Sequence, residues 1–174
     1  MSVIITSERL HLRTWKEDDL IPFSEMCANP LDMAYMPGLL TKEDTRRMIG
    51  RIVNHFDKNG FGLYAVEKKE DKGFIGFAGF MIPNFEQYFT PCIEIGWRIK
   101  NSEWNKGYAT EAAKACIEFG FSELAFERVY SFTSKHNIAS QRVIQKIGMH
   151  RLSNFNHPLL PSDHFLSEHV LYYL

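Results

Sequence analysis

The segment WNKGYATEA, residues 104–112, combines residue types that bind phosphate at the start of a helix. Its only glycine, Gly107, stands where a helical pattern begins, so an anion can approach the unpaired N–H groups of the first turn without meeting a Cβ atom. Lys106 adds positive charge, and Thr110 offers a hydroxyl within that turn. The alternative is an ordinary helix start in which the glycine only turns the chain.

Three polar residues elsewhere in the chain could also take part in chemistry. Glu94 lies in CIEIGW among residues that otherwise look buried, so desolvation could raise its pKa and make it a general base. Because Ile93 and Ile95 point to the opposite face of a strand, Glu94 could instead face solvent. Asn137 and Ser140 form an N-x-x-S step at the start of a short helical run, which taken alone indicates an asparagine N-cap.

Hydrophobic periodicity predicts the elements that position these residues. Apolar runs predict six strands, at residues 9–15, 61–68, 74–82, 92–99, 128–134 and 168–174. Spacings of three, four and seven predict helices at residues 16–27, 42–57, 109–124 and 138–147. In the first strand, Leu10 and Leu12 alternate with Arg9, His11 and Arg13, so we expect one half-exposed face. A single strand–helix–strand crossover at 91–134 indicates a sheet that is only partly parallel.

The stretches EIGWRIKNSEWNKGYATEA and SKHNIASQRVIQKIGM resemble motifs A and B of the GNAT acetyltransferase superfamily, and more closely those of its RimJ/RimL-like branch. The similarity is clearest from about Phe74 to Met149, and the opening ITSERLHLR and the closing HPLLPSDHFLSEHVLYYL resemble a bacterial subgroup of the same branch. The superfamily turn begins with Gln or Arg. Trp104 stands there in this chain, which weakens the general motif and favours the RimJ/RimL-like branch, where tryptophan occurs.

The resemblance implies a single N-acetyltransferase domain over residues 1–174 with an α/β (α+β) fold. We expect a mixed, mostly antiparallel sheet of about six to seven strands, with helices on both faces and central strands splayed to admit coenzyme A. Separation of two strands commonly occurs at a β-bulge, and we expect that bulge at Gly96.

The resemblance also implies which residues bind acetyl-CoA. Backbone N–H groups from Asn105 to Thr110 would hold the pyrophosphate, and main-chain groups of Trp97 and Ile99 would pair with pantetheine as a strand does. Asn137 would form a hydrogen bond to the pantetheine arm. The full set is Trp97, Ile99, Trp104, Asn105, Lys106, Gly107, Tyr108, Ala109, Thr110 and Asn137.

For catalysis, the resemblance implies direct movement of the acetyl group from the thioester to an amine. Glu94 is the expected general base, acting directly or through water. Many GNAT enzymes protonate the departing thiolate with a tyrosine seven residues after the asparagine that corresponds to Asn137. Because Ile144 stands at that position, Ser140 is the expected acid, and solvent is the alternative. A backbone N–H near Trp97 would stabilise the oxyanion.

Composition narrows the class of protein. Of the 174 residues 45% are apolar, and 20 Lys and Arg nearly balance 21 Asp and Glu, which favours neither nucleic acid nor a membrane surface as a partner. No run is long enough to span a membrane and no signal-peptide pattern opens the chain, so we expect a cytoplasmic protein. The three cysteines form no C-x-x-C pair, and the three histidines between 157 and 169 lack helical i, i+4 spacing, so no metal site is expected.

The sequence therefore predicts an N-acetyltransferase that uses acetyl-CoA, without a metal, to acetylate a small-molecule amine or a protein N-terminus in a ternary complex. The alternative is a non-catalytic acyl-CoA-binding module, which would keep Gly107 and Asn137 but need neither Glu94 nor Ser140. A dinucleotide-binding protein ranks last because the G-x-G-x-x-G turn is missing. Six apolar or aromatic residues could line a pocket for the acceptor, although packing in the core would explain each of them equally well. They are Tyr35, Met36, Phe80, Phe85, Tyr88 and Phe89. The sequence leaves a homodimer open.

Overall fold

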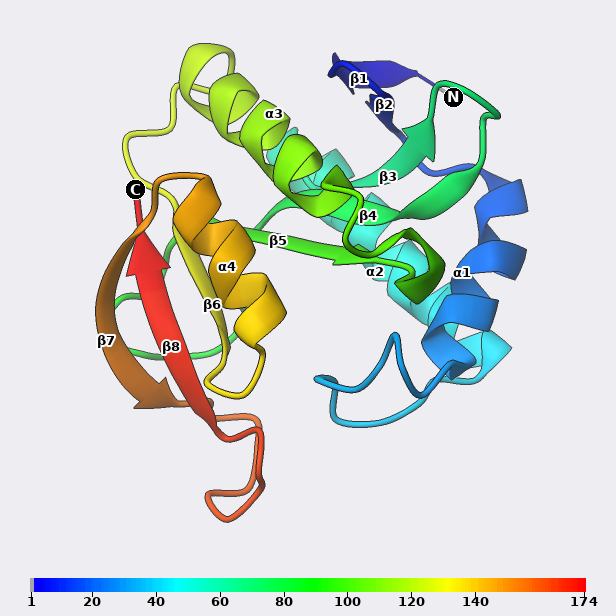
Figure 1. Ribbon diagram of the computed structural model, residues 1–174. Helices are drawn as coiled ribbons and strands as arrows, with labels where there is room; N and C mark the ends of the chain where they lie inside the picture. The colour runs from blue at the N-terminus through cyan, green and yellow to red at the C-terminus, as the bar shows by residue number, and fades with distance from the viewer. Residues whose placement is uncertain (1) are drawn as a thin grey trace.

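The computed structural model describes residues 2–174, which form one open sheet with helices on both faces (Figure 1). The strand order is β1-β2-β3-β4-β5-β6-β8-β7. The bounds are Val3–Thr6 for β1, Leu10–Arg13 for β2, Leu63–Lys68 for β3, Phe74–Met81 for β4, Glu94–Ile99 for β5, Tyr130–Ser134 for β6, His150–Asn156 for β7 and Glu168–Tyr173 for β8. Within this sheet β5 and β6 are the parallel pair, as the single crossover predicts.

The sheet has eight strands, and two of them, β1 and β7, are not predicted by the sequence pattern. Both lie at the edges of the sheet and are mostly exposed: β1 buries Ile5 alone, and β7 buries Phe155 alone. An edge strand with so little buried surface lacks the regular apolar alternation on which the expectation rests.

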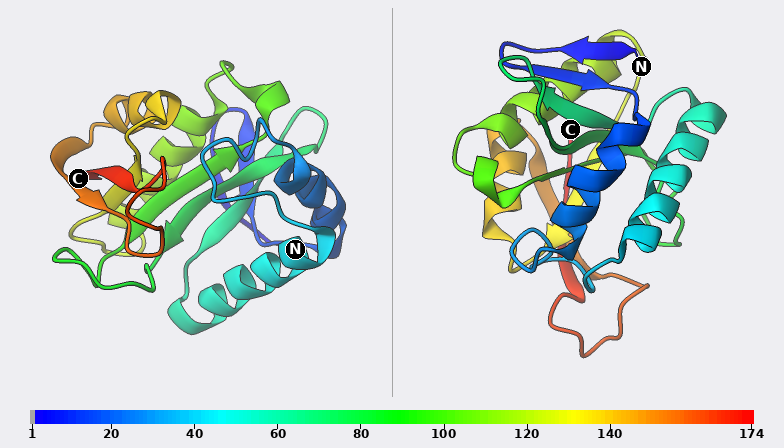
Figure 2. Two further views of the ribbon diagram at one scale, coloured as in Figure 1. Left: turned by 90° about the horizontal axis from the view of Figure 1, so that it is seen from below. Right: turned by 90° about the vertical axis from the view of Figure 1, so that its right-hand side faces the viewer.

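Two pairs of helices cover the two faces of the sheet (Figures 1 and 2). On one face lie α1 (Leu20–Ala28), which follows a 3-10 turn at Glu17–Asp19, and α2 (Lys42–Asn59). On the other lie α3 (Tyr108–Ser122), preceded by a 3-10 turn at Asn101–Glu103, and α4 (Ile138–Lys146). Each pair packs on its own apolar cluster. Among residues 2–174, no helix is both long and apolar enough to cross a lipid bilayer.

The end of β2 is buried on both faces, contrary to the half-exposed strand that its alternation predicts. Arg13 is 0% exposed, and its guanidinium donates to both carboxylate oxygens of Asp19 at 2.7 Å and to Glu67 Oε2 at 2.7 Å. Alternation reports the polarity of side chains, and a charged residue can be buried when its partners satisfy its hydrogen bonds.

Candidate active site

The turn before α3 has the backbone geometry that phosphate binding needs. Asn105 and Gly107 both adopt left-handed conformations, with φ of 61° and 85°. Within the described chain no side chain caps the helix, and the Glu111 N–H donates to the carbonyl of Gly107 at 3.0 Å. The N–H groups of residues 108–110 therefore have no acceptor within the helix. This exposed turn leaves several donors for an anion.

The β1–β2 hairpin holds this turn through contacts that sequence reasoning missed. Arg9 Nη1 donates to the carbonyl of Lys106 at 3.0 Å, and Arg9 Nε donates to Glu111 Oε2 at 2.7 Å. The Arg9 Cζ atom lies 4.5 Å from the centroid of the Tyr108 ring. The Arg9 N–H and the Ser7 hydroxyl both donate to Glu111 Oε1 at 2.7 Å. Burial would raise the pKa of Glu111, but these hydrogen bonds hold it below its ordinary value.

Two further residues of the turn are held by neighbours. Lys106 Nζ lies 2.9 Å from Glu103 Oε2, so part of the charge that Lys106 brings is already neutralised. Trp104 Nε1 donates to the carbonyl of Ile99 at 2.6 Å. The indole of Trp104 therefore connects the turn before α3 to the end of β5.

The sheet opens between β5 and β6, as the resemblance implies. The two strands share one paired position, Glu94 with Tyr130, whereas β4 and β5 share six and β6 and β8 share five. Beyond that pair, the Ser131 hydroxyl donates to the carbonyl of Ile95 at 3.0 Å in place of a backbone N–H. Figure 1 shows the two strands diverging from this point.

The prediction of a β-bulge at Gly96 is wrong. The β4–β5 register runs without a shift from Glu94 to Ile99, and Gly96 pairs regularly with Gly79. The strands separate because β6 turns away while β5 stays fully paired with β4. No extra residue in β5 is needed for that geometry, since the opening affects the other edge of the strand.

The opened edge of β5 offers main-chain groups to a ligand. The carbonyls of Ile93 and Ile95 both point toward β6, so the alternation of a strand turns the main-chain groups of Trp97 and Ile99 toward the same edge. An amide-containing ligand can pair there as an added strand does. Because the Ile99 carbonyl already accepts the Trp104 indole N–H, the main-chain N–H and carbonyl that stay available to a ligand are mainly those of Trp97.

Glu94 stands at the point where β5 and β6 part. Burial raises the pKa of its carboxyl to about 8, although the residue keeps some contact with solvent. Among residues 2–174 no cation forms an ion pair with Glu94. A fully solvated surface glutamate, the alternative drawn from the strand pattern, does not fit this desolvation. The role of general base stays a prediction.

The start of α4 has the predicted asparagine cap. Asn137 Oδ1 accepts the Ser140 N–H at 3.1 Å, which leaves Asn137 Nδ2 as a donor for a pantetheine carbonyl. Ser140 lies in the first turn of α4 and is partly buried. Ile144, seven residues after Asn137, stands where the resemblance to the family would place a tyrosine; it is 1% exposed and belongs to the core. The role of Ser140 as an acid stays a prediction.

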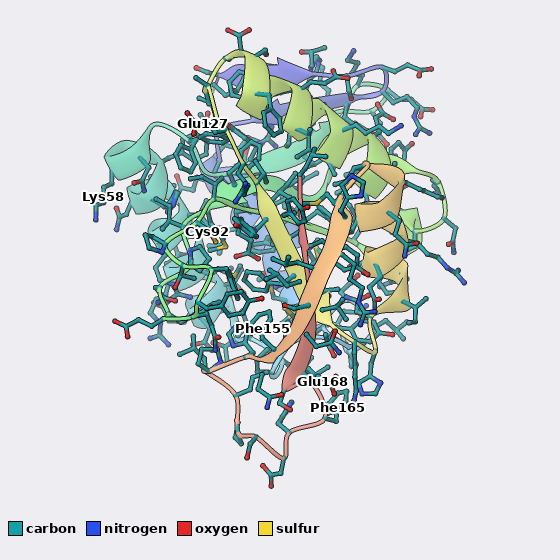
Figure 3. The ribbon with its side chains drawn as sticks, turned by 90° about the vertical axis from the view of Figure 1, so that its left-hand side faces the viewer. Lys58, Cys92, Glu127, Phe155, Phe165 and Glu168 are labelled. Carbon is teal, nitrogen blue, oxygen red and sulfur yellow. The ribbon has the colours of Figure 1, made fainter. Side chains whose placement is uncertain are left out.

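The residues considered for an acceptor pocket lie in different places. Phe80 is 0% exposed and its ring centroid lies 5.1 Å from that of Phe126, so it belongs to the core on the α3 side and not to a pocket. The loop between β4 and β5 instead forms an aromatic cluster with β6 and β7, made of Phe85, Phe89, Phe132 and Phe155. Figure 3 shows Phe155 and Cys92 on this flank of the molecule.

The site fits coenzyme A in two independent ways. The uncapped start of α3 suits a pyrophosphate, because Gly107 carries no Cβ and the first-turn donors are free. The opened edge of β5 suits the amide-bearing pantetheine arm. Trp104 connects these two parts of the site through its hydrogen bond to β5.

Comparison with known proteins agrees with this geometry. The family described as "Acetyltransferase (GNAT) domain" matches residues 9–150. The uncharacterized N-acetyltransferase YnaD of Bacillus subtilis is 32% identical over 148 residues, which cover 84% of this chain and 82% of YnaD. A GNAT-family acetyltransferase from Bacillus anthracis superposes with a TM-score of 0.81 at 29% identity, covering 98% of this chain and 96% of that chain.

A more distant structure shares the fold alone. RimL, a ribosomal L7/L12 alpha-N-protein acetyltransferase solved in complex with coenzyme A, has a TM-score of 0.78 at 15% identity and covers 99% of this chain and 97% of its own. The family match extends over most of the chain, and the site lies within it. This chain therefore belongs to the GNAT acetyltransferase family and is an acetyl-CoA-dependent acyltransferase.

Proposed function

We propose that this GNAT protein transfers the acetyl group of acetyl-CoA directly to a primary amine in a ternary complex, and that it belongs to the RimJ/RimL-like branch. The acceptor is a small-molecule amine or a protein N-terminus. The observation that carries the proposal is a carboxyl with a pKa of about 8, that of Glu94, at the single pair where β5 and β6 part. Trp104 in the turn before α3 supports the branch.

The chain holds the donor mainly through its backbone. The N–H groups of residues 105–110 bind the pyrophosphate, the β5 edge at Trp97 pairs with the pantetheine arm, and Asn137 Nδ2 donates to the same arm. Held in this way, the thioester supplies an activated acetyl group beside Glu94. Fixing both reactants in the site supplies a large part of the rate.

Glu94 receives the proton that the amine nitrogen loses as its bond to the acetyl carbon forms. A backbone N–H near Trp97 stabilises the negative charge that develops on the carbonyl oxygen. The carbon–sulfur bond breaks, and the thiolate takes its proton from Ser140 or from water. Because thiols are far more acidic than alcohols, this last proton needs little help from the protein.

Cys92 supports direct transfer over an acetylated enzyme. It precedes Glu94 by two positions, just before β5 begins, but burial, and then the charge of Glu94, raise the pKa of the Cys92 thiol to about 12. A thiol that stays protonated is a poor nucleophile. Cys27 and Cys116 are buried. In the described chain, therefore, no cysteine suits a covalent intermediate.

Acetyl transfer to a panel of amines and peptide N-termini tests the proposal, with release of the coenzyme A thiol followed by a thiol-reactive dye and products identified by mass spectrometry. We expect wild-type protein to acetylate at least one primary amine. Glu94→Gln should lose most of this turnover while still binding acetyl-CoA, and Glu118→Gln, on the exposed side of α3, is the matched control. Binding of acetyl-CoA without transfer to any amine would favour the acyl-CoA-binding module.

A further inference from the structure

Arg98 is a positive charge without a carboxylate partner on the strand that carries Glu94. Its Nη1 lies 3.3 Å from Met33 Sδ and 3.7 Å from Cys27 Sγ, and its Nη2 lies 2.9 Å from Met36 Sδ. Thioether and thiol sulfurs are weak, uncharged acceptors. Within residues 2–174, no aspartate or glutamate forms an ion pair with this arginine.

The surroundings make this arrangement costly for the protein alone. Desolvation lowers the pKa of Arg98, whose Cζ atom lies 5.3 Å from the centroid of the Phe77 ring. Asp32 acts on Arg98 only at longer range, because its two oxygens accept the backbone N–H and the side-chain amide of Asn101 at 2.5 and 2.9 Å. A guanidinium that has lost water and contacts only uncharged sulfur atoms and an aromatic ring will bind an anion from outside strongly.

The strand face between Glu94 and Arg98 is open. Positions i, i+2 and i+4 of a strand share one face, so Gly96 lies between the two charged residues. A Cβ atom on Gly96 would find no heavy atom nearer than Glu94 Oε1, at 4.0 Å. At the rise of a β-strand the α-carbons of Glu94 and Arg98 are roughly 13 Å apart. A ligand that lies over Gly96 can therefore reach both side chains.

The residues around Arg98 come from α1 and from the loop that joins it to α2, residues 29–41. Cys27 belongs to α1, and Met33 and Met36 belong to the loop. The Asp32–Asn101 hydrogen bonds attach this loop to the segment that follows β5. The end of α1, the loop and the strand thus meet around Arg98, on the face opposite α3 and α4.

Resting on the acetyl transfer proposed above, we propose that the acceptor is an amine that carries a carboxylate several bonds from its nitrogen. Arg98 binds the carboxylate through its planar fork, and Glu94 receives the proton of the amine at the other end. The sulfur atoms of Met33 and Met36 then surround the ion pair with an apolar wall. Arg98 is thus a specificity residue that fixes the far end of the acceptor.

Two classes of acceptor carry an amine and a carboxylate several bonds apart: ω-amino acids, and short peptides with a free N-terminus and a free C-terminal carboxylate. The first arm of the test compares ω-amino acids from β-alanine to aminooctanoate with their amides as acceptors, and the second compares dipeptides with their C-terminal amides. We expect wild-type kcat/KM to favour the carboxylate over its amide by roughly ten- to a hundredfold at one chain length, mainly through KM.

Arg98→Met should abolish this preference by raising KM for the carboxylate while leaving KM for the amide unchanged. Arg98→Lys keeps the charge without the fork and should retain part of the preference. Arg51→Met, on the exposed side of α2, is the matched control. Thermal unfolding and acetyl-CoA binding show whether each variant is folded, and Arg98→Lys carries the test if Arg98→Met is not.

Outcomes of this test separate the two proposals. Equal use of carboxylate and amide by the wild-type protein would overturn the assignment to Arg98 and leave acetyl transfer intact. Failure to acetylate any amine would count against acetyl transfer itself. Calorimetric titration of the amino acid series into protein loaded with coenzyme A needs no turnover: binding that Arg98→Met removes supports the assignment, and a series that never binds overturns it.

Discussion

As the proposed general base, Glu94 would set the pH range of the reaction, because burial raises the pKa of its carboxyl to about 8. A general base must be unprotonated, and a pKa of about 8 leaves most of this carboxyl protonated at neutral pH. The cause is burial without a compensating cation. Below about pH 8 the wild-type side chain therefore resembles a neutral glutamine in charge, and above it the base is available.

We predict that wild-type kcat/KM for a chosen amine rises with pH through about 8 as Glu94 loses its proton. In Glu94→Gln this step should be missing, and kcat/KM above pH 8 should fall by roughly a hundredfold. The difference between the two proteins should shrink at lower pH, where both side chains are neutral. Initial rates across the pH range measure this, and identical profiles would remove Glu94 from the mechanism.

Single residues differ in how far the sequence predicts them. Gly107 and Glu94 stand out because each is an unusual residue type within a regular local pattern. Ser131, which faces the opened edge of β5, and Arg98 do not, because their roles depend on segments that meet only in the folded chain. Because β6 also contains Thr133 and Ser134, its sequence does not single out Ser131.

The turn before α3, which is proposed to bind phosphate, contacts a distant element, the β1–β2 hairpin. Arg9 and Glu111 are 102 residues apart in sequence, yet they form the ion pair that fixes the first turn of α3. A flexible turn would have to be ordered when the ligand binds, which costs affinity. Arg9 therefore acts by positioning Lys106 and its neighbours before the ligand arrives.

We predict that Arg9→Met weakens acetyl-CoA binding by roughly five- to thirtyfold, because the hydrogen bonds from the guanidinium to Lys106 and Glu111 are both lost. Arg51→Met is again the control, since it removes a charge of the same sign from an exposed position. Calorimetry with acetyl-CoA on the three proteins measures the effect. Unchanged affinity in Arg9→Met would show that the turn is ordered without the hairpin.

The Arg13 ion pairs also hold separate elements together: they join β2 to β3 and to the turn before α1. Removing one partner from a buried network leaves the others charged and without water. We predict that Arg13→Met lowers the free energy of unfolding by about 3 to 5 kcal/mol, measured by urea denaturation. A loss below about 1 kcal/mol would mean that Asp19 and Glu67 regain contact with water in the variant.

Elements with strong periodicity agree with their sequence-based predictions, and those with weak patterns do not. α2 covers the helix predicted at residues 42–57, and β3, β4 and β5 lie where their apolar runs predict. β1 and β7 have too little buried surface to produce a pattern. The bulge expected at Gly96 is absent because the opening depends on the direction of β6, which local sequence does not encode.

The whole sheet has two parts, β1 to β5 and β6, β8 and β7, which meet at one backbone pair. An apolar cluster beneath α3 and α4 joins them, with members such as Tyr64 from β3 and Val170 from β8. On the other face, aromatic packing joins the β4–β5 loop to β6 and β7. The molecule can therefore keep an opening for its ligand within a continuous core.

His157 belongs to this aromatic region, with its ring centroid 4.8 Å from that of Phe85 and 4.9 Å from that of His169. Burial, and then the neighbouring His169, lower the pKa of His157 to about 4. The unfolded chain takes up a proton near pH 6.5, whereas the folded protein does so only near 4. The free energy of unfolding should therefore fall as pH drops through that window.

We predict that His157→Phe reduces the pH dependence of the free energy of unfolding between about pH 6.5 and 4. One histidine contributes less than about 1.4 kcal/mol per pH unit to that slope. His150→Phe, on the exposed part of β7, should leave it unchanged. Urea denaturation at several pH values measures the three slopes. Parallel slopes would show that His157 is protonated in the folded protein without cost.

Calorimetric titration with acetyl-CoA examines the site on which everything else depends, the start of α3 together with the opened edge of β5. We expect saturable one-to-one binding by the wild-type protein, no response to NAD, and loss of binding in Gly107→Glu, which adds bulk and negative charge where φ is 85°. Dephospho-CoA serves as a second control for the nucleotide end. If the wild-type protein does not bind acetyl-CoA, the turn before α3 is an ordinary helix start, and the roles given to Glu94, Ser140 and Arg98 would all be contradicted.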